Sequence, residues 1–87
     1  MAVRTQSARF STNESPASIN RGRGWSVSSA GAWLRAHDFR VPRVDRTENQ
    51  LRFRQFTPTA CKRDSFRTLT EDLPRGVQLV TCDTVED

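Results

Sequence analysis

Large apolar side chains are few in this chain and unevenly placed, which limits how much of it can form a core. Leu, Ile, Val and Phe together account for 18 of the 87 residues, and 14 of these 18 lie between residues 25 and 82. A charged chain this poor in large apolar residues can build one small core. We therefore expect a single small domain over residues 25–82, preceded by a flexible basic arm over residues 1–24 and followed by an acidic tail over residues 83–87.

The first 24 residues show neither a helical nor a strand period and are rich in Ser, Thr, Asn, Arg and Gly. Such a composition is typical of a linker or arm. Four arginines against Glu14 make this segment net positive, and it ends in Arg21-Gly22-Arg23-Gly24. We expect a disordered cationic arm whose removal leaves the domain folded.

Residues 25–82 show the periods of one helix and three strands. Apolar residues at helical spacing, with Ser26 placed as the N-cap, predict a helix over residues 27–37. Thr57-Pro58 predicts one helical turn, and alternating or β-branched stretches predict strands over residues 49–56, 65–70 and 77–82. The expected fold is α+β, with one helix packed on a three-stranded antiparallel meander.

The expected core joins the apolar stripe of the helix to the alternating strands. Trp33 and Leu34 lie on that stripe, while Leu51, Phe53 and Leu79 lie on the strands. Because the helix has a single apolar stripe, we expect these five side chains to be buried against one another.

The two cysteines, Cys61 and Cys82, form no Cys-x-x-Cys pair and the chain has a single histidine. This pattern indicates neither a disulfide framework nor a zinc site, so we expect both thiols to be reduced. No apolar stretch exceeds three residues. We expect a soluble, intracellular protein with no membrane partner.

The charge is positive and concentrated in the first part of the chain. The formal net charge is +4, with 13 Arg and one Lys among the basic residues, and most of the arginines precede residue 61. A basic front with an acidic end suits a polyanion or an acidic protein surface as partner.

The strand predicted over residues 49–56 gives the best candidate binding surface. Its alternation places Arg52, Arg54 and Phe56 on one face, and Arg67 of a neighbouring strand is expected on the same side. Guanidinium groups around one ring suit phosphates with a base stacked on the ring. The alternative is a solvated face on which arginine stems cover Phe56. The candidate nucleic-acid or partner-binding residues are Arg52, Arg54, Phe56, Arg67 and, from the arm, Arg21 and Arg23.

Nothing in the sequence indicates an enzyme. His37 is the only histidine, and its place on the apolar stripe favours a structural residue at the helix end. The glycines at 22 and 24 follow no expected strand and form no phosphate-binding loop. We expect no catalytic residue, cofactor or metal site.

One segment resembles a known family. The run Trp33-Leu34 with His37, then Thr47-Glu48-Asn49, Arg52-Phe53-Arg54-Gln55, Pro58, Ser65-Phe66-Arg67-Thr68 and Gly76-Val77, resembles a small domain found in tailed-bacteriophage and prophage gene products. The resemblance covers about residues 33–82 and departs at Asp38, where the family pattern favours Gly after the helix. It implies a viral or mobile-element origin and supplies no catalytic residues.

Two functions from different classes follow. The first is a non-enzymatic module that contacts the phosphates of DNA or RNA through arginines of a sheet face and the arm. The second is a virion structural or assembly protein whose arm orders on a neighbouring subunit. The protein would act in the host cytoplasm or in the virion, and the sequence leaves its oligomeric state open.

Overall fold

The computed structural model describes residues 3–16 and 24–84. Its elements in chain order are strand β1 (Val3–Ser11), helix α2 (Val27–Ala36), strands β2 (Asp45–Arg46) and β3 (Gln50–Arg54), the 3-10 turn η1 (Pro58–Ala60), and strands β4 (Arg67–Leu69) and β5 (Val77–Asp83). The α+β class, with one helix and an antiparallel sheet, is confirmed for the described residues.

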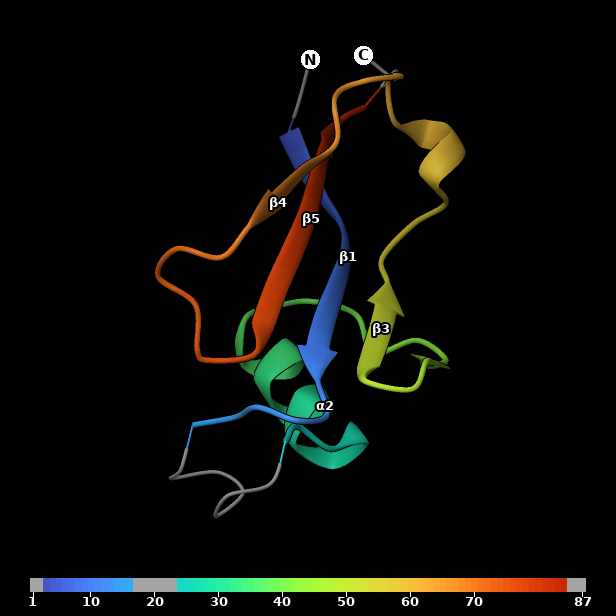
Figure 1. Cartoon of the computed structure of the whole chain (residues 1–87). Helices are drawn as coiled ribbons and strands as arrows, with labels where there is room; N and C mark the ends of the chain where they lie inside the picture. Colours follow the sequence, from blue (N-terminus) through green and yellow to red (C-terminus); the bar gives the residue numbers. More distant parts are fainter. Residues whose placement is uncertain (1–2, 17–23, 85–87) are drawn as a thin grey trace.

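The sheet has five strands in the order β2-β3-β1-β5-β4, and every neighbouring pair is antiparallel. Figure 1 shows β1 in blue between β3 and β5, with α2 at the end of the sheet where β1 finishes. The prediction of a three-stranded meander is wrong, because β1 and β5 lie between β3 and β4. The three predicted strands are present, and β1 and β2 are additional.

The predicted flexible arm is wrong over Val3–Ser11, which form the central strand of the sheet. The domain therefore begins before residue 25. It also extends past residue 82, because Asp83 is the last residue of β5 and Thr84 forms a bridge with Cys61. Arg21, Arg23 and residues 85–87 lie outside the described residues.

Two buried residues make this polar segment a central strand, and a change of register interrupts its apolar alternation. Ala8 and Phe10 lie opposite Phe53 and Leu51 of β3 and are fully buried. The pairing with β5 shifts between Thr5 and Ser7, as in a β-bulge, which inserts one extra residue into the strand. Beyond this point the apolar alternation is lost.

Helix α2 follows the sequence prediction to within one residue. The Ser26 hydroxyl accepts a hydrogen bond from Ser29 N–H in a capping box. At the other end Phe39 N–H donates to the carbonyl of Leu34 and Asp38 N–H donates to that of Arg35, which are the two bonds of a Schellman motif. Asp38 has a φ of 61°, the left-handed conformation that glycine usually provides at this position.

Phe10 is the centre of the core. Its ring lies edge-on to Trp25, Trp33 and Phe53, at centroid distances of 5.0, 5.8 and 5.6 Å. Leu34, Leu51 and Phe53 are buried as predicted, whereas Trp33 and Leu79 are partly buried at the margin. The core residues missed from the sequence include Ala8, Phe10 and Trp25.

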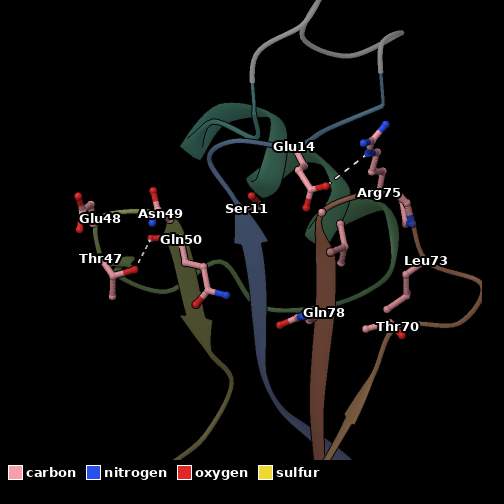
Figure 2. Close-up of a pocket in the computed structure, with 13 residues that line it drawn as sticks. Ser11, Glu14, Thr47, Glu48, Asn49, Gln50, Thr70, Leu73, Arg75 and Gln78 are labelled. Atoms are coloured by element: carbon pink, nitrogen blue, oxygen red, sulfur yellow. Dashed lines mark hydrogen bonds and ion pairs between the residues drawn. The ribbon is translucent and has the colours of Figure 1, made fainter.

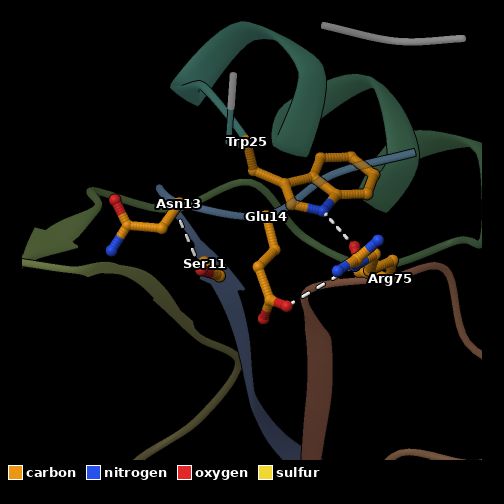
Figure 3. Close-up of polar contacts among 5 residues, drawn as sticks. All are labelled: Ser11, Asn13, Glu14, Trp25 and Arg75. Atoms are coloured by element: carbon orange, nitrogen blue, oxygen red, sulfur yellow. Dashed lines mark hydrogen bonds and ion pairs between the residues drawn. The ribbon is translucent and has the colours of Figure 1, made fainter. Parts of the chain in front are cut away.

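The end of β1 is fixed to the segments around it. Trp25 N–H donates to the carbonyl of Ser11 and Trp25 Nε1 donates to that of Arg75, both at 2.8 Å. Figure 3 shows the Trp25 bond beside the ion pair of Arg75 and Glu14, at 3.5 Å. Gly76 has a φ of 86° and lies so close to the backbone of Glu14 that a side chain would overlap it.

The prediction of two reduced cysteines is also wrong, since Cys61 and Cys82 form a disulfide with their Cα atoms 5.6 Å apart. The bond attaches the connection between β3 and β4 to the end of β5. Lys62 N–H also donates to the carbonyl of Asp83, and Asp83 N–H donates to the Ser65 hydroxyl. Cysteines 21 residues apart carry no sequence pattern that indicates such a pairing.

Candidate nucleic-acid interface

The sheet presents one face to α2 and the other away from it. Leu51 and Phe53 of β3 are buried in the core beneath the helix, so the alternating Arg52 and Arg54 lie on the opposite face, as the sequence predicts. We call this opposite face the outer face. The strand register adds Ser7 and Arg9 of β1 to it, opposite Arg54 and Arg52.

A row of polar side chains crosses four strands of the outer face. Asp45 of β2 lies opposite Arg52, Arg52 opposite Arg9, and Arg9 opposite Gln78 of β5. Two arginines are therefore direct cross-strand neighbours near the middle of the sheet. Arg9 is not among the candidates predicted from the sequence, because its segment shows no strand pattern and was expected to be part of the arm.

Phe56 lies beyond β3, which ends at Arg54, and is half-buried. The guanidinium carbon of Arg4 is 4.8 Å from the centroid of its ring, a cation–π contact. Arg4 comes from the start of β1 and, like Arg9, was assigned to the arm.

Two hollows share Phe56 and are rich in arginine. One has a volume of about 390 Å³ and the other about 310 Å³. Arg4 and Arg40 line the first together with Asp38; Arg40, Arg43 and Arg54 line the second together with Asp45. We call Phe56 with Arg4, Arg40, Arg43 and Arg54 the Phe56 surface.

None of the four arginines of the Phe56 surface has a carboxylate of another described residue within 4 Å. The ion pair found within residues 3–16 and 24–84 is the one between Arg75 and Glu14. The guanidinium groups of the Phe56 surface thus keep their charge available for an external anion.

The buried Gln55 side chain holds Arg40 in place. Its Nε2 donates to the carbonyl of Arg40 at 2.9 Å, and Arg40 N–H donates to its Oε1 at 2.8 Å. Arg40 Nη1 also donates to the carbonyl of Gln55 at 3.3 Å. These bonds join the segment after α2 to the end of β3. Arg40 and Arg43 were missed because that segment carries no sequence motif.

The remaining candidate residues do not join this surface. Arg67 lies opposite Thr81, whereas its neighbour Thr68 lies opposite Val80, whose partner Ser7 is on the outer face. Arg67 therefore faces the α2 side, and the expectation that it shares a face with Arg52 and Arg54 is wrong. Arg21 and Arg23 lie outside the described residues.

A larger hollow, of about 590 Å³, lies at the end of the outer face near α2 (Figure 2). Its charged side chains are Glu14, Glu48 and Arg75, and Arg75 is paired with Glu14. Its uncharged polar side chains are the amides of Asn49, Gln50 and Gln78 and the hydroxyls of Ser11, Thr47 and Thr70. With more carboxylates than free cations, this hollow does not suit a phosphate.

His37 is the C-cap of α2 and stacks on Trp33 at a centroid distance of 4.0 Å, which agrees with a structural role at the helix end. No group of three or more His, Cys, Asp or Glu side chains that could hold a metal ion occurs within the described part of the chain. No helix in that part is long and apolar enough to cross a membrane.

Comparison of the chain with protein-family models, curated proteins and solved structures finds no match.

Proposed function

We propose that this protein is a small, non-enzymatic module that binds nucleic acid through its phosphates at the Phe56 surface. The observation that carries the proposal is the gathering of Arg4, Arg40, Arg43 and Arg54 around one half-buried ring, with no carboxylate of a described residue within 4 Å of them. A net charge of +4 strengthens the attraction of a polyanion.

The arginines supply most of the binding free energy and little sequence preference. Each guanidinium that contacts a phosphate releases counterions from the nucleic acid, so affinity falls as salt rises. A base of a single strand stacks on Phe56 by replacing Arg4, and the displaced Arg4 guanidinium then contacts the phosphate beside that base. Stacking on Phe56 therefore favours single strands over duplexes.

Fluorescence anisotropy with labelled oligonucleotides tests the proposal. The Arg40→Gln/Arg43→Gln variant should weaken binding to unrelated sequences equally, by about tenfold. Arg35→Gln/Arg75→Gln is the matched control, because it also removes two positive charges from exposed positions and neither arginine belongs to the Phe56 surface. Equal losses in the two variants would contradict a localised interface.

The Phe56→Leu variant tests stacking separately from charge. It should weaken binding to single strands by about tenfold, since a stacked base contributes roughly 1 to 3 kcal/mol. Duplex binding should change less. An equal loss for both ligands would mean that Phe56 supports the fold of the surface and stacks on no base.

A virion structural or assembly protein is the second candidate function. Strand β4 favours this second function, because it is an edge strand and an uncovered edge can pair with another chain. Two large apolar side chains, Phe66 beside β4 and Leu69 within it, are also exposed there. Val3–Ser11 cannot be the arm that orders on a neighbouring subunit, because they pair with β3 and β5 of their own chain. The Cys61–Cys82 disulfide favours the virion over the host cytoplasm, because disulfides persist in oxidising surroundings.

The resemblance of residues 33–82 to a phage domain supports a viral or mobile-element origin for either function. Light scattering after size exclusion separates the two functions. A monomer that binds oligonucleotides supports the first, and a stable oligomer without nucleic-acid binding supports the second.

A further inference from the structure

Arg9 and Arg52 form an unusual pair at the middle of the outer face. They lie directly opposite each other on β1 and β3, and both are half-buried. Side chains in such positions have Cβ atoms only about 5 Å apart, so two like charges there repel each other. Neither guanidinium has an ion-pair partner among the described residues, although Asp45 is the other neighbour of Arg52.

Two buried polar atoms, one within this pair and one beside it, also lack hydrogen-bond partners. Arg52 Nε and Ser7 Oγ are fully buried and form no hydrogen bond within the described part of the chain. Ser7 precedes Arg9 by two positions on the same face and lies opposite Arg54. Buried donors without acceptors are rare, because each loses its bonds to water without replacement.

We propose that Arg9, Arg52 and Ser7 form a binding site for a phosphate-type oxyanion. One tetrahedral anion between the two guanidinium groups would cancel their repulsion and accept hydrogen bonds from both. A small shift of the Arg52 side chain would give Nε and the Ser7 hydroxyl an acceptor. The proposal rests on the proposed function in taking a nucleic-acid phosphate as the natural source of the anion.

The groups around this site favour an anion of modest charge. Arg54 adds a third cation directly opposite Ser7. Asp45, opposite Arg52, repels the anion, and Gln78 offers an uncharged amide on the far side of Arg9. Arg9 and Arg52 lie one row from Arg54, which belongs to the Phe56 surface. A strand that follows the Phe56 surface can therefore place its next phosphate on Arg9 and Arg52.

Nuclear magnetic resonance of the arginine Nε–H groups tests the site in the full chain. Inorganic phosphate, added at constant ionic strength against chloride, should shift the Arg9 and Arg52 signals to saturation and leave Arg75 unmoved. Dimethyl phosphate, a diester, should shift the same signals if the natural ligand is a nucleic-acid backbone. Shifts with inorganic phosphate alone would contradict the backbone phosphate as its source.

Matched variants complete the test. Arg9→Gln should weaken phosphate binding by about tenfold, and Asp45→Asn should strengthen it severalfold. Arg52→Lys keeps the charge but loses the two-pronged geometry, so it should also weaken binding if the variant melts like the parent protein. The proposal is wrong if the folded parent shows no saturable shift at Arg9 and Arg52.

Oligonucleotide binding separates this proposal from the proposed function. Binding of oligonucleotides without a phosphate response at Arg9 and Arg52 overturns the subsite and leaves the Phe56 surface in place. A phosphate response without oligonucleotide binding overturns the proposed function and its nucleic-acid source, and leaves the oxyanion site standing.

Discussion

Phe10 is a single side chain on which most of the core depends. It is fully buried and meets three other aromatic rings. Phe10→Ala should lower the free energy of unfolding by about 4 kcal/mol, through lost burial and the cavity left behind. Urea unfolding followed by tryptophan fluorescence measures this change.

Val3→Ala is the control for Phe10→Ala, because Val3 lies on the same strand with 69% of its surface exposed. Its effect should stay below about 0.5 kcal/mol. A Phe10→Ala protein that unfolds at the same urea concentration as the parent would contradict the central position of β1.

Some residues of the candidate site could be placed from the sequence, because neighbouring residues determine their position, and others could not. Arg52 and Arg54 could be placed on one face from the alternation of their own strand. Arg4 and Arg9 could not, because their position depends on a strand that pairs with residues more than 40 positions away. Arg40 is held at the surface by hydrogen bonds with Gln55, which leave no trace in the sequence, and Arg43 follows on the same segment.

The residue that ends α2 lowers the free energy of unfolding. Asp38 occupies the left-handed position of the Schellman motif and places a carboxylate near the negative end of the helix dipole. Asp38→Gly should raise the free energy of unfolding by about 1 kcal/mol, since it removes both costs. Thermal unfolding followed by circular dichroism measures the gain.

Asp38→Ala separates the two causes, because it removes the carboxylate and keeps the Cβ atom. It should stabilise the protein less than Asp38→Gly does. Equal stability of the two variants would show that the left-handed backbone costs little here.

The disulfide holds the connection from β3 to β4 against the end of β5. Cys61 and Cys82 are 21 positions apart, and a crosslink over this length stabilises a small protein by about 3 kcal/mol, chiefly by restricting the unfolded chain. The Cys61→Ala/Cys82→Ala variant should therefore unfold at a lower temperature than the oxidised parent. Reductant should lower the melting temperature of the parent and leave the variant unchanged.

Elements with a local signal could be predicted, and elements defined by distant partners could not. Ser26 marks the start of α2, and the alternation around Phe53 marks β3. In β1 the register shift between Thr5 and Ser7 breaks the period of two, and the buried Gln6, Ser7 and Ala8 are polar or small. A segment with that pattern resembles a linker until its partners are known.

Strand β1 joins what would otherwise be two separate pieces of sheet. One piece contains β2 and β3, and the other contains β4 and β5. The same strand supplies Arg4 to the Phe56 surface and Arg9 to the outer face. Val3–Ser11, expected to be part of a dispensable basic arm, are thus central to the fold and to the proposed interface.

The salt dependence of binding to a single-stranded oligonucleotide tests the proposed function most directly. With about four phosphates contacted by the Phe56 surface, the logarithm of the association constant should fall with a slope of about −3 against the logarithm of salt concentration. Affinity should then drop about 50-fold between roughly 50 and 200 mM salt. Absence of binding at 50 mM, or binding that does not change with salt, would contradict a nucleic-acid interface built from arginines.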